Sequence, residues 1–238
     1  MATRLSFLAL ACFSLSVSAY SQSFTLSPSD DVWVYPHAAD PGYDPIGRVW
    51  GDSVDSYVPS WPPIEDFSYT YLRFDLSGIA PGQYQLISAN LRVTHRVTSS
   101  GTFTREAGEA YPLEARGLSG TFSEATWTFT NPTNPYPEAK LFGLGNMNNY
   151  NPSSSFDITM NLRNTVFQNE FNTAVNSGAK TLVIALTSKM PVTGQVGALP
   201  YRVFTRDYAV SGQRPVLHVS LKRLPSLGIV PIKVQPIR

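Results

Sequence analysis

Cysteine is almost absent from this sequence of 238 residues, in which Cys12 is the only one. It lies in an apolar run over residues 5–17 that follows Arg4 and precedes the small residues Ser18 and Ala19. This order is typical of a secretory signal peptide, so we expect cleavage after Ala19 and a secreted protein, extracellular or at the cell surface. The mature chain would then hold no cysteine, which excludes a disulfide framework, thiol catalysis and cysteine-ligated zinc or iron.

Long apolar runs are also absent beyond residue 17. The run over residues 5–17 is itself well short of the ~20 apolar residues that a membrane-spanning helix needs. We therefore expect no stable insertion into a membrane.

Charged residues make up only 15% of the sequence, and neither sign dominates. Lys plus Arg number 18 and Asp plus Glu 17, so loss of Arg4 with a signal peptide makes the two equal. This balance argues against nucleic acid as a partner, because such binding needs a net basic face. Along the chain the charges are uneven: residues 30–66 hold one cation, Arg48, and eight carboxylates, namely Asp30, Asp31, Asp40, Asp44, Asp52, Asp55, Glu65 and Asp66.

Motifs that mark common catalytic sites are absent from the sequence. There is no nucleophile elbow, His-Glu-x-x-His zinc motif, phosphate-binding loop or dinucleotide fingerprint. A glycosidase needs only two suitably placed carboxylates, which Glu106, Glu109 and Glu114 could supply. On or beside strands such residues are more often solvated, so we expect no enzyme and keep polysaccharide lyase or hydrolase activity as a minor alternative.

The pattern along the chain predicts an all-β protein. Short runs rich in β-branched and aromatic residues are separated by Gly, Pro, Asn and Ser, and several alternate apolar and polar residues, as Leu91 and Val93 do around Arg92. We expect an antiparallel, jelly-roll-like β-sandwich with one short helix. The expected strands cover residues 31–35, 69–76, 89–97, 110–115, 155–159, 181–187, 201–205 and 215–221.

The sandwich is expected over residues 24–221, after the signal peptide at residues 1–19. Within it, the apolar residues of 162–175 are spaced as in a helix, and this helix should pack across an end of the sandwich. Residues 40–67 are rich in proline, acidic and aromatic residues and predict a long self-packed loop. Residues 222–238 form a basic, proline-containing tail, which is either a disordered linker or an extra strand for self-association.

Several segments together resemble one known family. Residues 71–77 (YLRFDLS), 78–82 (GIAPG) and 87–93 (ISANLRV) are similar to the segment that names the DNRLRE domain, also classed as carbohydrate-binding module family 96. Further segments follow in the order that this family uses, namely residues 31–34, 122–127, 156–159, 204–207 and 214–219.

The resemblance implies a jelly-roll-like sandwich of exported microbial proteins, some joined to polysaccharide lyases, with acidic polysaccharides as ligands of characterised members. We therefore expect a secreted, non-catalytic carbohydrate-binding module that attaches to an extracellular, anionic polysaccharide. The alternative is a structural or adhesive surface or matrix protein that assembles through its sandwich and its C-terminal tail.

Cations and aromatic rings are the expected ligand-binding groups. Guanidinium groups bind carboxylates or sulfates in a bidentate manner, and aromatic faces support sugar rings. Arg73 and Arg206 lie in the family-like segments and could equally pair with neighbouring carboxylates, whereas Arg92 and Arg96 share one strand face opposite to His95. The candidate residues are Arg73, Arg92, Arg96, Arg206, Trp50, Tyr57 and Trp61, with the three aromatic residues serving either as a sugar platform or as a plug for their loop.

The acidic segment also suggests a metal site. Calcium prefers several carboxylate and carbonyl oxygens, and Asp30, Asp31, Asp40 and Asp44 are the expected ligands of a structural calcium ion. The alternative is an exposed acidic loop, because no fixed calcium-loop spacing is present. The three histidines, His37, His95 and His218, have no local metal-ligand spacing.

Overall fold

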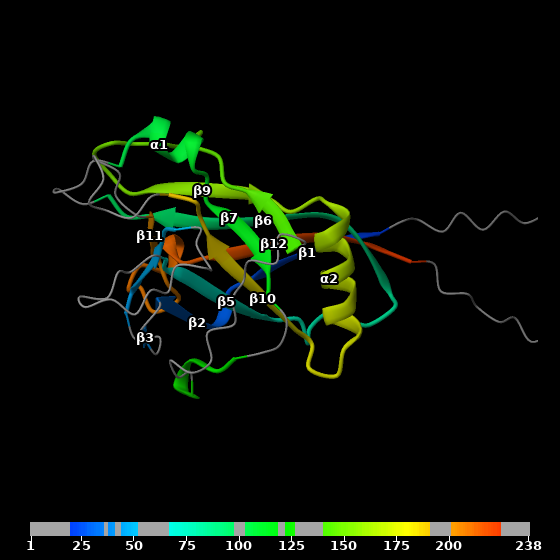
Figure 1. Cartoon of the computed structure of the whole chain (residues 1–238). Coiled ribbons are helices and arrows are strands. Elements are labelled where there is room, and N and C mark those ends of the chain that lie inside the picture. The colour runs from blue at the N-terminus through cyan, green and yellow to red at the C-terminus, as the bar shows by residue number, and fades with distance from the viewer. Residues whose placement is uncertain are drawn as a thin grey trace, which may run out of the picture.

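The computed structural model describes residues 20–35, 38–40, 44–51, 67–97, 103–118, 122–126, 140–190 and 201–224, and these form two packed antiparallel β-sheets (Figure 1). The first sheet runs in the order β1 (Ser21–Leu26), β12 (Val216–Arg223), β6 (Tyr84–His95), β11 (Tyr201–Phe204) and β4 (Ile46–Val49), with β9 (Phe156–Asn161) also paired to β6. The second sheet runs in the order β3 (Ala38–Asp40), β2 (Pro28–Tyr35), β5 (Tyr69–Asp75), β10 (Thr181–Thr187), β7 (Glu114–Gly117) and β8 (Leu141–Leu144).

Most connections between consecutive strands cross from one sheet to the other. Of the eleven connections between consecutive described strands, eight change sheet, among them those from β1 to β2, from β5 to β6, from β9 to β10 and from β10 to β11. This is a jelly-roll-like sandwich, and the predicted fold class is confirmed.

Alternating side chains build the core between the sheets. Along β9, Phe156, Ile158 and Met160 are buried, whereas the residues between them are partly exposed. On β6, Leu91 lies opposite Met160 on β9 and opposite Leu217 on β12, and all three are fully buried. Burial of each such side chain contributes roughly 1.5–3 kcal/mol, so the period-two pattern fixes which face of each strand meets the core.

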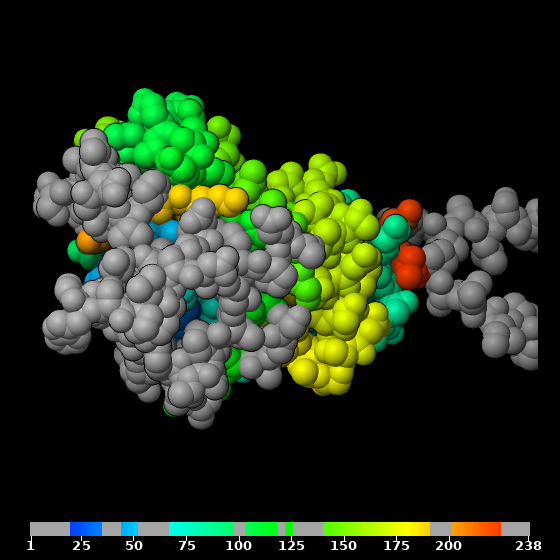
Figure 2. Space-filling model, viewed as in Figure 1, coloured from blue at the N-terminus to red at the C-terminus, as the bar shows by residue number. Residues whose placement is uncertain are grey.

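The predicted helix is confirmed as α2 (Thr165–Asn176). It begins where the side chain of Asn164 accepts a hydrogen bond of 2.8 Å from the backbone N–H of Phe167. Its buried face includes Phe167 and Phe171, and the helix covers one end of the sandwich, as predicted (Figures 1 and 2).

A second helix was not predicted. The segment over residues 110–115 was expected to be a strand, but Ala110 ends the short helix α1 (Arg105–Ala110) and β7 begins only at Glu114. Thr104 caps this helix by accepting a hydrogen bond of 3.1 Å from the N–H of Ala107. That cap is a local signal that alternation alone does not reveal.

The predicted long loop is partly strand. Residues 46–49 form β4, and Trp50 makes an isolated bridge to Ser68 next to the second sheet. This strand is short and has prolines on both sides, so the sequence pattern did not indicate it. Residues 52–66 lie outside the described residues.

The ends of the sandwich differ slightly from the expected bounds. β1 begins at Ser21 and pairs with β12, which continues to Arg223. The expected signal peptide and residues 225–238 of the tail lie outside the described residues. In the part of the chain that the structure describes, no helix has the length and apolar character to cross a bilayer.

Candidate functional site

Three arginines lie side by side in the first sheet, two on the strands β4 and β11 and the third directly after the end of β6. Arg48 on β4 is the direct register partner of Arg202 on β11. On the other side of β11, the backbone N–H of Arg96 donates a hydrogen bond of 2.7 Å to the carbonyl of Arg202. Directly opposite residues of antiparallel strands carry their Cβ atoms about 4.5–5.5 Å apart. We call Arg48, Arg202 and Arg96 the arginine row.

The charges of the arginine row are not balanced within the described structure. None of the ion pairs formed between described residues includes Arg48, Arg96 or Arg202. Burial, followed by the positive charges of Arg48 and Arg96, lowers the pKa of the Arg202 guanidinium. Like charges opposite one another destabilise a sheet, so the row costs stability unless an anion compensates it.

Within the described part of the chain, one hydrogen-bond donor of the row lacks a partner. Nε of Arg202 is buried and has no hydrogen-bond partner among the described residues. Arg48 and Arg96 are exposed, and Cζ of Arg48 lies 5.0 Å from the ring centroid of Trp33, within the range of a cation–π interaction. Trp33 therefore helps to orient one guanidinium without neutralising it.

His95 lies behind the row, on the opposite face of β6. It is 2% exposed and packs against the rings of Phe103, Phe156 and Tyr201. Its Nδ1 accepts a hydrogen bond of 3.3 Å from the backbone N–H of Arg202, which requires that this nitrogen carry no proton. Burial, and then the charge of Arg202, lower the pKa of His95 to about 3.

The buried His95 should make stability depend on pH. Its folded pKa lies below its unfolded value of 6.5, so only the unfolded chain takes up this proton between about pH 6.5 and pH 3. Stability is therefore lost as the pH falls through this window, and His95 should account for about 2–3 kcal/mol of that loss by pH 4.5.

Urea unfolding at pH 7 and pH 4.5 checks this expectation. The His95→Gln variant should lose less stability than the natural sequence between the two pH values. Equal losses in the two proteins would show that His95 takes up a proton in the folded state.

The predicted arginines have different surroundings. Arg73 forms an ion pair with Asp30, and its guanidinium also donates to the carbonyl of Phe122. Arg92 contacts Asp157 at 3.3 Å and donates to the carbonyls of Gly212 and Arg214 at 2.9 and 3.3 Å. Both therefore tie separate segments together, whereas Arg96 belongs to the arginine row.

The fourth predicted arginine, Arg206, is also engaged. Its Nε lies 3.0 Å from Glu124 and 3.8 Å from Asp207, and its guanidinium donates to the carbonyl of Ser29. Its backbone N–H donates to Oδ2 of Asp31 at 2.6 Å. Arg206 thus links β2, the turn after β11 and the 3-10 helix η1 (Glu124–Thr126).

Of the predicted aromatic residues, only Trp50 is described. It is 6% exposed and belongs to the core, so it anchors its segment and offers little surface to a sugar. Tyr57 and Trp61 lie outside the described residues.

The predicted metal ligands do not form a single group among the described residues. Asp30 pairs with Arg73, and Oδ1 of Asp44 accepts a hydrogen bond of 3.0 Å from the backbone N–H of Ile46. The side chain of Asp40 lies outside the described residues. Asp31 instead lies with Glu124 and Asp207, and one carboxylate oxygen from each lies within 4.8 Å of the others. We call these three residues the acidic cluster.

Sequence reasoning missed Glu124 and Asp207 as partners of Asp31. Both belong to segments that carry the family resemblance, residues 122–127 and 204–207, and that was the available signal. Burial raises the pKa of the Asp31 carboxyl to about 7, although the N–H of Arg206 opposes the shift. Burial also raises the pKa of Glu124.

The three candidate catalytic glutamates differ in their exposure to solvent and in the elements that carry them. Glu106 and Glu109 are exposed on α1, where Glu109 pairs with Arg105 at 2.7 Å, so they lie on a helix and not beside strands as predicted. Glu114 was expected to be solvated, but it is buried and pairs with Arg116 at 2.8 Å.

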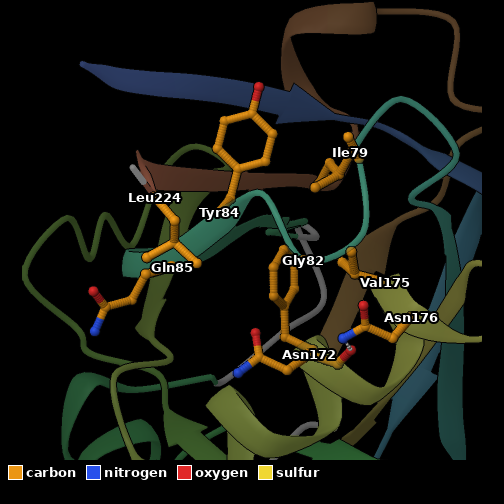
Figure 3. A pocket seen from close by; sticks show the side chains of 10 residues that line it. Ile79, Gly82, Tyr84, Gln85, Asn172, Val175, Asn176 and Leu224 are labelled. Carbon is orange, nitrogen blue, oxygen red and sulfur yellow. Dashed lines mark hydrogen bonds between the residues drawn. The ribbon is translucent and has the colours of Figure 1, made fainter. Parts of the chain in front are cut away.

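A hollow of about 470 Å³ lies between α2 and the start of β6 (Figure 3). Tyr84 and Leu224 lie on one side, and Asn172 and Val175 of α2 lie on the other. The hydroxyl of Tyr84 donates to Gln22 at 2.9 Å. This polar group is already used, so the hollow is a weaker candidate than the arginine row.

Comparison of the chain with protein-family models and with curated proteins finds no match to either. The resemblance to the DNRLRE domain therefore stays a prediction from the residues quoted above.

Proposed function

We propose that this protein is a secreted, non-catalytic carbohydrate-binding module that attaches to an acidic extracellular polysaccharide through the arginine row. The observation that supports the proposal is the alignment of Arg48 on β4, Arg202 on β11 and Arg96 directly after β6, with no ion pair to a described carboxylate. A sequence with a net charge of only +1 keeps these three like charges together at a cost to its stability.

The chemistry of the row suits carboxylate or sulfate groups. A guanidinium presents several donors in one plane and can bind either group with two parallel hydrogen bonds. Neighbouring strands lie about 4.7–4.9 Å apart, so the row spans two such steps across the sheet. Charged groups on successive sugars of one chain can therefore meet more than one arginine, which adds their contributions to affinity.

The test is a binding panel for the protein without residues 1–19. Polyuronates, sulfated polysaccharides and uncharged polysaccharides are each titrated at low and high salt, and soluble products are measured in the same samples. We expect saturable binding to anionic chains alone, weakening as salt screens the charges, without release of products. Binding to uncharged chains only would contradict the role of the arginine row, and released products would contradict the non-catalytic assignment.

Absence of binding throughout the panel would favour the structural or adhesive alternative. One observation speaks for it: β1 is an edge strand among the described strands, and an exposed edge can accept a strand from another chain. Light scattering at high concentration, with and without residues 224–238, distinguishes a self-associating protein from a monomer.

A further inference from the structure

The acidic cluster brings together three segments that are distant in the sequence. Asp31 comes from β2, Glu124 from η1 and Asp207 from the turn after β11. Asp31 is fully buried and Glu124 is 5% exposed, whereas Asp207 is exposed and gives access from solvent. Burial of two carboxylates next to a third is costly unless positive charge lies close to them.

One oxygen of this cluster lacks a partner within the described structure. Oδ2 of Asp31 accepts the backbone N–H of Arg206, but Oδ1 is buried without any hydrogen-bond partner among the described residues. Arg206 and the backbone N–H of Asp31 both contact Oε2 of Glu124, and no hydrogen bond between described residues involves its Oε1. The acidic cluster therefore has carboxylate oxygens that make no hydrogen bond to a described residue and could bind a ligand.

The neighbouring cations do not balance the charge. Asp30 lies beside the cluster, where its Oδ1 accepts the N–H of Glu124 at 3.4 Å. The four carboxylates face two guanidinium groups, those of Arg73 and Arg206. When all are ionised, the group carries a net charge of two negative units, which a divalent cation would neutralise.

We infer that Asp31, Glu124 and Asp207 bind a calcium ion. Calcium takes oxygen ligands at about 2.3–2.6 Å, so two ligands of one ion can be separated by roughly 4.8 Å, which matches the spread of the three carboxylates. Magnesium binds at about 2.0–2.1 Å in a stricter octahedron, which favours calcium for this group. Water completes the coordination on the exposed side of Asp207.

The ion would hold η1 and the turn after β11 against β2. This inference rests on residues other than the arginine row, so it goes beyond the proposed function and does not depend on it. The expected effect is a more stable folded state, because the ion binds the folded chain and not the unfolded one.

Calorimetric titration of the full-length protein with calcium chloride, after removal of metals with EDTA and desalting, tests the inference. The same samples are melted with and without calcium, and magnesium chloride serves as the comparison ion. We expect one saturable calcium site per chain, a higher Tm with calcium, and weaker binding of magnesium. No saturable calcium binding would overturn the inference.

Variants then locate the site. Asp207→Asn changes an exposed side chain, so the protein should fold, and its Kd for calcium should rise at least tenfold. Glu109→Gln removes an equivalent negative charge from α1 and should leave the Kd unchanged. Calcium binding that is equal in Asp207→Asn and the natural sequence would overturn the assignment of these ligands. Since neither variant alters the arginine row, polysaccharide binding reports separately on the proposed function.

Discussion

Replacement of Arg48, Arg96 and Arg202 together by glutamine should weaken binding to an anionic polysaccharide at least a hundredfold. Each guanidinium lost removes charge-assisted hydrogen bonds to a carboxylate or sulfate, and such bonds are about twice as strong as neutral ones. The Tm should stay the same or rise, because the substitutions relieve repulsion between directly opposed like charges. Titration calorimetry and thermal melting of the same samples measure both effects.

A fall in affinity for the polysaccharide without a fall in Tm would show that the arginine row serves binding and not the stability of the fold. If the arginine row served only to hold the fold together, its removal would lower the Tm along with the affinity. Arg163→Gln is the control, since Arg163 is an exposed cation just before α2 and forms no ion pair with a described residue. The control variant should bind as the natural sequence does. Full affinity in the triple variant would refute the proposed site.

The fold was predictable because its signals are local. Alternation along β9 and β6 and helical spacing along α2 appear in the sequence itself, and burial follows them in the structure. At residues 110–115 the prediction of a strand was wrong in part. The N-cap Thr104 starts the helix α1, which occupies residues 105–110. The strands β1, β3, β4 and β8 were not among the expected ones; each is six residues long or shorter, and β4 lies among prolines.

The candidate site was much less predictable, because it depends on which strands pair. Arg48 was noted only as a lone cation in an acidic segment, and Arg202 lay in an expected strand without a recognised role. The register of β4 against β11 makes them neighbours, and no local pattern specifies that register. The acidic cluster has the same origin: Asp31 was identified from its segment, whereas its partners Glu124 and Asp207 come from elsewhere in the chain.

Replacement of Arg116 by methionine should be among the most destabilising single substitutions in this protein. Arg116 and Glu114 lie on β7, their side chains are 5% and 9% exposed, and Nε of Arg116 donates to Oε2 of Glu114 at 2.8 Å. Thr187 on β10 donates to the same oxygen at 2.9 Å. Loss of the guanidinium leaves a buried carboxylate without its counter-charge, which typically costs about 3–5 kcal/mol in the free energy of unfolding.

The loss of stability in Arg116→Met should come from the unbalanced negative charge of Glu114, and a second substitution can test this. In the double variant Glu114→Gln/Arg116→Met, the glutamine keeps an acceptor for Thr187 and carries no charge, so most of the lost stability should return. Arg105→Met is the matched control, because it breaks an ion pair with Glu109 in which both side chains are exposed. The urea midpoint of this variant should barely differ from that of the natural sequence. If the double variant were as unstable as Arg116→Met, the packing of the arginine stem, and not its charge, would be what β7 requires.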